Sequence, residues 1–376
     1  MTSTQSRASR REAARADLLE SRLRRYRQPF QGAVRALAAR HARLADLAAS
    51  FPALLFALAV PRFGKKPAAA IARVIGGYSL AEVAAAADVP LWLRKLPPEA
   101  LTQPIMKLPD GALFRRQIVN HLPPSPRLAP AWLQAVADVT DLAHEAAAVW
   151  IAREFVRDPK SVKPAPLRLI SLWSWFSSQP ETFGHALIDK PWTPDMRIES
   201  AHAAARAWHT TLELHVILGR APIADVWLRA ARVDGYDFVP LTSTAAISEE
   251  AHAMRNCVRA YGNEVAHNHT RLWSMRRDGE RVATLSVGTA CGDPMPSLTE
   301  LKGPGNAKAP LDVWWAARRW VHMHDLPQIK MEPRDWGTAP LDRVTWVALW
   351  RPYWLAKRRI PAWLPITPSR KALDTL

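Results

Sequence analysis

One segment of the sequence is richer in reactive side chain types than any other. HAMRNCVRAYGNEVAHNHT, residues 252–270, contains one of the two cysteines of the chain and three of its 12 histidines. A thiol beside histidines is the combination used in nucleophilic catalysis and in zinc sites. A cysteine between apolar residues on a helix is more often part of a core. The element that carries the cysteine therefore decides between these interpretations.

The residues around this cysteine predict a helix over 248–262. Ser248 with the acids after it suits a helix start, and Gly262 can end the helix in a left-handed conformation. On that helix one stripe follows the spacing i, i+4, i+7 and i+11. The stripe consists of Glu250, Met254, Cys257 and Tyr261. We predict a buried, structural Cys257, whereas Glu250 and Tyr261 could direct polar atoms into a cleft.

A nucleophilic or metal-binding cysteine is the alternative. A catalytic thiolate needs a nearby base, yet His252 lies roughly 140° around the helix from Cys257. Cys291, the second cysteine, is far along the chain, and the closely spaced cysteine pairs of structural zinc sites are missing. We therefore predict no metal and no cofactor, and leave open whether the chain is an enzyme. The catalytic candidates are Glu250, Cys257 and Tyr261.

A second segment, ELKGPGNAK, has the composition of an anion-binding turn. Gly303 and Gly305 allow the backbone to turn its amides toward an anion, and Lys302 and Lys308 supply positive charge. Asn306 tolerates left-handed geometry and can hydrogen-bond a ligand. The predicted anion site is Lys302, Gly303, Gly305 and Asn306; the alternative is a glycine-rich connection between strand and helix. The Walker pattern of nucleotide hydrolases is absent.

The elements that must position these residues predict an α+β fold. Alanine-rich amphipathic segments indicate that the first 230 residues are helical. RLWSMRRDGERVATLSVG then predicts a hairpin that turns at Asp278-Gly279, and a helix follows Pro310. We expect a mostly helical N-terminal region and a small antiparallel β-sheet module flanked by helices. The predicted divisions are a basic helix or tail at 1–30, a helical region at 31–230, the α+β module at 231–330 and a Trp/Pro-rich basic segment at 331–376.

Residues 76–98 could be mistaken for a DNA-reading helix-turn-helix. Ser79 and Glu82 form a predicted capping box, and Asp88 with Pro90 marks a turn into a second helix. Pro97 ends that second helix after about two turns, which is short for a helix that reads a major groove. We favour a plain helical hairpin over a DNA reader.

The charge of the chain suggests its partner. The net charge is +17, while the hydrophobic and charged fractions, 48% and 23%, are ordinary. Such an excess favours nucleic acid, bound by non-specific backbone contacts, over anionic membrane or an acidic protein. The most apolar segment, Phe51 to Pro61, is shorter than the about 20 residues that span a bilayer, so we predict a core helix there and no membrane span. Two cysteines and no secretory signal predict a cytoplasmic protein.

Three segments together resemble the PcfJ-like domain family of conjugative plasmids, phages and bacterial chromosomes. MRNCVRAYG is followed by the hairpin and then by LTELKGPGN, over roughly residues 235–325. Many members have His where this chain has Asn256, which argues against a required His-Cys pair. The positions that match are Met254, Cys257, Val258, Tyr261, Thr284, Gly303 and Asn306. The resemblance implies an association with mobile elements and no defined activity.

Two functions follow as hypotheses. In the first, the chain is a nucleic-acid-associated protein linked to mobile elements, whose basic surface grips the phosphate backbone. In the second, the C-terminal module is an enzyme that acts on a phosphodiester or a nucleotide. That enzyme would need Glu250, Tyr261, Lys302 and Asn306 around one pocket.

Overall fold

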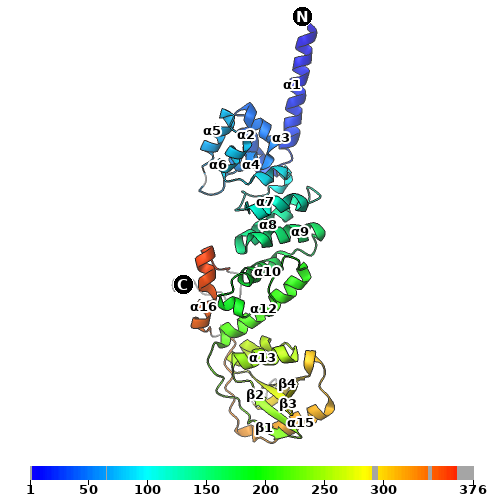
Figure 1. The fold of residues 1–376 in the computed structure, drawn as a ribbon, viewed down its shortest axis with the longest axis vertical. Helices are drawn as coiled ribbons and strands as arrows, with labels where there is room; N and C mark the ends of the chain where they lie inside the picture. The colour runs from blue at the N-terminus through cyan, green and yellow to red at the C-terminus, as the bar shows by residue number, and fades with distance from the viewer. Residues whose placement is uncertain (1, 65, 290–294, 338–340, 362–376) are drawn as a thin grey trace. The chain divides into compact units, whose positions relative to one another are not determined.

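The computed structural model describes residues 2–64, 66–289, 295–337 and 341–361, and it confirms the predicted α+β fold (Figure 1). Helices form the chain as far as residue 218, and the strands follow. The chain divides into two compact units. Unit 1 comprises Met1–Ser178 and Pro191–Ala205, and unit 2 comprises Gln179–Lys190 and Arg206–Leu376. The long helix α12, Ile198–Leu218, therefore contributes residues to both units.

Unit 1 contains only helices and connecting segments among its described residues. Its α-helices are α1 Thr2–Leu23, α2 Gln28–Ala38, α3 Ala42–Ser50, α4 Pro52–Ala59, α5 Ala68–Gly76, α6 Leu80–Ala87, α7 Ala112–Gln117, α8 Ala129–Leu142, α9 Glu145–Arg157, α10 Pro164–Ser177 and the start of α12. Short 3₁₀ turns lie at Leu91–Lys95, Pro98–Ala100 and Ile118–His121.

Helix α4 confirms the predicted core helix. Pro52 occupies its first turn, where a missing N–H costs nothing. Leu54, Leu55 and Phe56 have no exposed surface, because neighbouring helices cover every side of α4. Among the described residues, no helix is both long and apolar enough to cross a bilayer.

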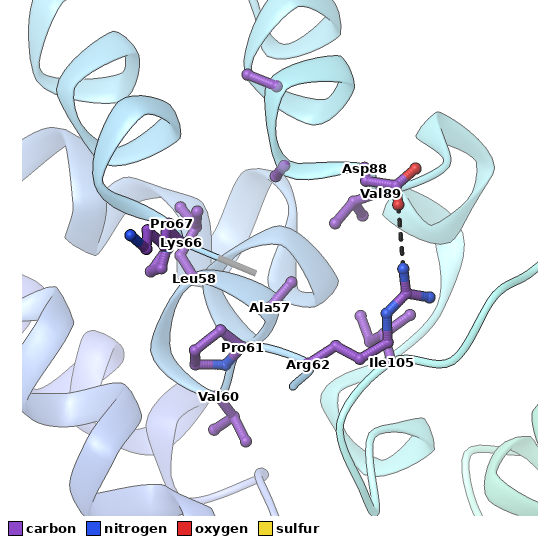
Figure 2. A pocket seen from close by; sticks show the side chains of 12 residues that line it. Ala57, Leu58, Val60, Pro61, Arg62, Lys66, Pro67, Asp88, Val89 and Ile105 are labelled. Atoms are coloured by element: carbon purple, nitrogen blue, oxygen red, sulfur yellow. Dashed lines mark hydrogen bonds and ion pairs between the residues drawn. The ribbon is translucent and has the colours of Figure 1, made fainter. Parts of the chain in front are cut away.

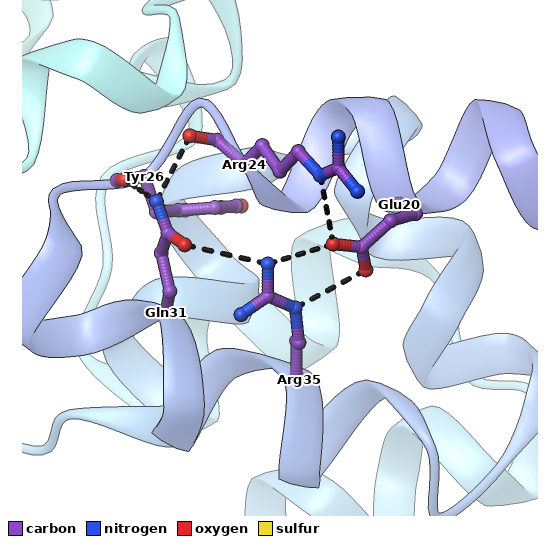
Figure 3. Close-up of polar contacts among 5 residues, drawn as sticks. All are labelled: Glu20, Arg24, Tyr26, Gln31 and Arg35. Atoms are coloured by element: carbon purple, nitrogen blue, oxygen red, sulfur yellow. Dashed lines mark hydrogen bonds and ion pairs between the residues drawn. The ribbon is translucent and has the colours of Figure 1, made fainter.

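Polar contacts attach the end of α1 to α2 (Figure 3). The Arg35 guanidinium donates to Glu20 Oε1 at 2.7 Å, and Arg24 donates to the same oxygen at 3.1 Å. The Gln31 amide donates to the carbonyls of Arg24 and Tyr26 in the turn that follows α1. Residues 11–18 of α1 are exposed, whereas Leu23 at the end of the helix is buried.

Residues 76–98 contain one α-helix rather than two. The capping box is confirmed: Ser79 Oγ accepts from the amide of Glu82, and Glu82 accepts from the amide of Ser79. Asp88 then ends α6 in the left-handed region, at φ 56°. The predicted two-turn second helix is wrong, because Leu91–Lys95 forms a 3₁₀ turn held between prolines. No helix long enough to read a major groove lies in this segment.

Glu154 joins α9 to the start of α12 within unit 1. Its side chain is buried, and Arg157 lies 2.6 Å from Oε1. Arg153 and Arg197 each lie 3.5 Å away, and the backbone amide of Ile198 donates to Oε2 at 3.2 Å. The carboxylate thus satisfies a free amide at the α12 N-terminus, where the helix dipole also favours negative charge.

Unit 2 is built around a five-stranded antiparallel sheet in the order β1-β2-β3-β4-β5. The strands are β1 Ala231–Val233, β2 Tyr236–Pro240, β3 Thr270–Arg277, β4 Glu280–Thr289 and β5 Pro296–Lys302. The predicted turn at Asp278-Gly279 is confirmed, with φ of 50° and 85°. Asp234-Gly235 makes the same kind of turn between β1 and β2, at φ 52° and 81°. Positive φ at both central residues matches the twist of a hairpin.

Helices cover both faces of the sheet. Helix α15, Leu311–His322, packs Val313, Ala316 and Trp320 on one face, where they meet Trp273 and Leu285. On the other face, α13 (Thr244–Met254) and α14 (Gly262–Ala266) pack with the part of α12 that belongs to unit 2. This second face carries the predicted site residues.

Helix α16, Arg343–Lys357, is the α-helix of the described part of the predicted Trp/Pro-rich segment. Trp346, Trp350 and Tyr353 are buried, so this segment contributes to the core of unit 2. Asp342 caps α16, and a Cβ at Gly219 would lie 2.7 Å from the Asp342 side chain. Gly219 also has φ +64°, so both close approach and backbone geometry require glycine there.

Replacing Glu154 by Ala should lower the free energy of unfolding of unit 1 by about 2–3 kcal/mol, the range for hydrogen bonds to charged groups. The α12 N-terminal amide and Arg157 lose their acceptor, and Arg153 and Arg197 lose a nearby negative charge. Urea denaturation followed by tryptophan fluorescence measures the change. Asp46→Ala is the control, because the Arg15–Asp46 pair is exposed on both sides and should matter little. Equal effects of the two variants would contradict this role of Glu154.

Candidate functional site

The predicted site residues come together around a small open recess of about 260 Å³ in unit 2. Cys257, Tyr261, Lys302 and Asn306 all line it, although the first and last are far apart in the sequence. The other lining residues are Asn256, Val258, Leu272, Thr284, Leu285, Ser286 and Glu300. Glu250, Gly303 and Gly305 do not line the recess.

Strands β4 and β5 form the floor of the recess, and their register decides which side chains face it. Thr284 pairs with Lys302 and Ser286 pairs with Glu300, whereas Leu285 pairs with Leu301 between them. Because side chains alternate along a strand, the four polar residues face α13 and the two leucines face the other way. Glu300 was not among the predicted site residues, yet its spacing of two from Lys302 was a signal for a shared face.

Cys257 is exposed, so the prediction of a buried, structural cysteine is wrong. The predicted helix over 248–262 does not form either. Helix α13 begins at Thr244, capped by Ser243, and ends at Met254 because Arg255 adopts φ 50°. A 3₁₀ turn follows at Val258–Tyr261. The expected stripe is therefore broken after Met254, and Cys257 lies in the turn instead.

The prediction that Gly262 ends a helix is wrong. It begins α14 with right-handed geometry, at φ −56° and ψ −42°. A Cβ at this position would lie 3.3 Å from Leu214 Cδ1 and 3.4 Å from Leu214 Cα. Close approach to α12, rather than backbone freedom, therefore accounts for this glycine.

The Cys257 thiol and the ELKGPGNAK turn are in direct contact. Cys257 Sγ lies 3.7 Å from Asn306 Oδ1, to which it donates. Gly305 and Asn306 have φ of 65° and 62°, as predicted for a left-handed turn. Gly303 does not: its φ is −76°, and a Cβ there would meet its nearest neighbour, the Ala307 carbonyl, at 3.6 Å. The turn therefore depends on Gly305 and Asn306, and not on Gly303.

Glu250 supports the recess from behind. Its side chain has no exposed surface, and it accepts from Arg281 Nε at 2.9 Å and from Thr284 Oγ1 at 2.6 Å. Thr284 Oγ1 in turn accepts from Asn256 Nδ2 at 2.8 Å, and Asn256 Oδ1 accepts from the amide of Val258 at 3.3 Å. This chain of hydrogen bonds positions the turn that holds the thiol, so Glu250 is a positioning residue.

A carboxylate balances the charge of Lys302. Lys302 Nζ lies 3.5 Å from Glu300 Oε1, and the Tyr261 hydroxyl donates to Glu300 Oε2. Burial, and then the bond to Glu300, raise the pKa of the Tyr261 hydroxyl far above its ordinary value. Tyr261 is therefore a hydrogen-bond donor at neutral pH. An anion in the recess would meet Lys302 and Asn306, but also the carboxylate of Glu300.

The histidines of the opening segment do not join the thiol. His269 stacks on Trp336 with ring centroids 4.3 Å apart, and His267 lies 5.5 Å from the same ring. His252 is exposed on α13. Among the described residues, no group of three or more His, Cys, Asp or Glu could hold a metal ion. Cys291 lies outside the described residues.

A larger cavity of about 520 Å³ lies in unit 1 between α4, α5 and α6 (Figure 2). Its walls are mainly apolar, with Leu58, Val89 and Ile105 among them. The Arg62–Asp88 ion pair, 3.3 Å long, closes the polar side. Because Arg62 and Asp88 pair with each other, they do not form a set of polar groups directed at a ligand.

Comparisons with protein families, with curated proteins and with solved structures found no match for this chain. The resemblance to the PcfJ-like family stays a prediction that rests on the matching residues. The structure adds that five of those residues line one recess: Cys257, Val258, Tyr261, Thr284 and Asn306. The recess presents hydrogen-bond donors and a solvent-exposed thiol, and its one cation, Lys302, is paired with Glu300.

Native protein should react rapidly and stoichiometrically with iodoacetamide at Cys257, because the thiol is exposed and has only one long hydrogen bond. A Cys291→Ala background isolates the signal, and mass spectrometry of the intact protein counts the adducts. Cys257→Ala in the same background should take up no label. A native thiol that becomes reactive only in urea would contradict its exposed position.

Proposed function

We propose that this chain binds nucleic acid through the positive charge of its N-terminal helices. The observation that carries the proposal is the distribution of charge. The first 127 residues contain 21 Lys and Arg against 8 Asp and Glu, whereas residues 128–342 are close to neutral. Such a concentration of cations attracts phosphates at long range and is typical of proteins that bind the nucleic-acid backbone.

The ion pairs of this region leave most of its cations without a carboxylate. Glu20, Asp46, Asp88, Glu99 and Asp110 pair with six arginines. In the described part of residues 11–127, eleven exposed cations have no carboxylate within ion-pair distance. They are Arg11, Arg27, Arg40, Arg43, Lys66, Arg73, Arg94, Lys95, Lys107, Arg116 and Arg127. These side chains are available to phosphates.

Binding of this kind is weakly selective for sequence. Residues 76–98 hold no recognition helix: α6 has eight residues, and its exposed residues are alanines and Glu82 rather than the Arg, Lys, Asn or Gln that make bidentate contacts to bases. Contacts to phosphates fix position on a duplex and carry no sequence information. The link to mobile elements and a cytoplasmic location belong to the same proposal, and they rest on the family resemblance and on the cysteine content.

The affinity for duplex DNA should fall steeply with salt. Each phosphate contact contributes a slope of about −0.9 in log affinity against log salt concentration. Replacing Lys95, Lys107 and Arg116 together by Gln should weaken binding and make this slope less negative by up to about 2.7. Fluorescence anisotropy of a labelled duplex over a range of salt concentrations measures both quantities.

A matched triple variant controls for the loss of charge alone. Arg220, Arg255 and Lys330 are exposed cations of unit 2, and changing all three to Gln removes the same charge. This variant should retain most of the slope. Absence of binding at low salt, or an affinity that does not change with salt, would refute the proposal.

The recess supports a second proposal, that the C-terminal module acts on a phosphodiester or a nucleotide. Convergence of Cys257, Tyr261, Lys302 and Asn306 is the observation that favours it. The recess is small and open to solvent, so it has room to contact a phosphate group but does not enclose a whole nucleotide. Lys302 would provide the charge and Asn306 a hydrogen bond.

Lys302→Ala should abolish the binding of inorganic phosphate and any hydrolysis of bis(4-nitrophenyl) phosphate, while the melting temperature hardly changes. Gly305→Val should reduce both binding and stability, because it forces a β-branched residue to φ +65°. Calorimetric titration and absorbance at neutral pH give the two readouts. If Lys302→Ala and wild type bind phosphate equally, the turn is only a connection between strand and helix.

A further inference from the structure

The outer face of α15 exposes large side chains that no other part of the described chain covers. Its inner face, including Val313, Ala316 and Trp320, packs on the sheet. Leu311 and Trp315 on the outer side are 77% and 58% exposed. Arg318 and His322 continue the same stripe, at helical spacings of three and four. The stripe from Leu311 to His322 is about 16 Å long.

A shallow, open groove lies between this face and the edge strand β1. Val233 of β1 forms one side, and residues of α15 form the other. The Arg319–Asp234 ion pair, 2.8 Å long, and the bond from Trp320 Nε1 to the Arg229 carbonyl hold α15 beside β1. The lining residues are Val233, Trp315, Arg318, Arg319, His322 and Met323. The groove therefore combines one indole ring with basic side chains.

The charges of the groove decide which ligand suits it. Arg319 is already paired with Asp234, and the nearby Arg277 is paired with Asp312 at 3.4 Å. Arg318 forms no ion pair among the described residues, and its guanidinium carbon lies 5.9 Å from the Trp315 ring centroid. An acidic peptide would need several unpaired cations to offset its carboxylates. A flat ring beside one free guanidinium is instead suited to a nucleobase and its phosphate.

We propose that the α15 face binds single-stranded nucleic acid, with a base stacked on Trp315 and the adjoining phosphate held by Arg318. Duplex DNA cannot use this surface in the same way, because its base faces are stacked on one another. The roughly 16 Å of exposed helix is longer than one nucleotide, so the strand on either side of the stacked base also lies against α15. This inference rests on the proposed nucleic-acid binding and assigns it a second, single-strand-specific surface.

The test compares a fluorescein-labelled oligothymidylate with a labelled duplex of equal length by fluorescence anisotropy at one salt concentration. Trp315→Ala should weaken binding of the single strand about tenfold and leave duplex binding unchanged. Trp315→Phe retains an aromatic face and should restore most of the affinity. Trp336→Ala is the matched control, because Trp336 is a similarly exposed tryptophan of the same unit, 64% exposed. Melting temperatures show that each variant is folded.

The outcomes separate this inference from the proposed function. If wild type binds the duplex but Trp315→Ala binds the single strand as well as wild type does, the α15 surface is refuted and the proposed function stands. If wild type binds neither probe, both fail. If labelled poly-glutamate binds wild type but not Trp315→Ala, and the single strand binds both equally, α15 is a peptide-binding face and the inference is overturned.

Discussion

The buried carboxylate of Glu250 is the constraint on which the recess depends. A charge without solvent is strongly unfavourable unless it is paired and hydrogen-bonded, and Glu250 meets this requirement only through Arg281 and Thr284 of β4. Helix α13 is therefore fixed against β4 at one position. The hydrogen bond from Asn256 to Thr284 then holds the turn that carries Cys257 against β4. A displacement of α13 would break these bonds and leave a buried charge unpaired.

The two units use positive charge in different ways. In unit 2, cations near the sheet form ion pairs with carboxylates of the same unit. Examples are Arg281–Glu250, Arg319–Asp234 and Arg277–Asp312. Arg271 is an extreme case: it is buried, and it lies 4.4 Å over the Trp227 ring and donates to backbone carbonyls. Burial lowers the pKa of its guanidinium. In the first 127 residues, by contrast, the carboxylates are too few for the cations, which favours contacts to phosphate there.

Several elements could be predicted because their causes are local. The Ser79–Glu82 capping box, the Asp278-Gly279 turn and the short apolar helix α4 each depend on residues a few positions apart. The α+β division followed from the same kind of pattern. The enzyme hypothesis placed Glu250, Tyr261, Lys302 and Asn306 around one pocket, and all of these except Glu250 line the recess.

The sequence by itself determined where helices, turns and the excess of positive charge lie, because spacing and φ preferences act between near neighbours. Only the tertiary structure decided that α13 ends at Met254 and that Cys257 is exposed. Gly262 must lie against Leu214 of α12, and Asn256 must reach Thr284 of β4. These contacts join residues far apart in the chain, and their combined free energy outweighs the local preference for one continuous helix.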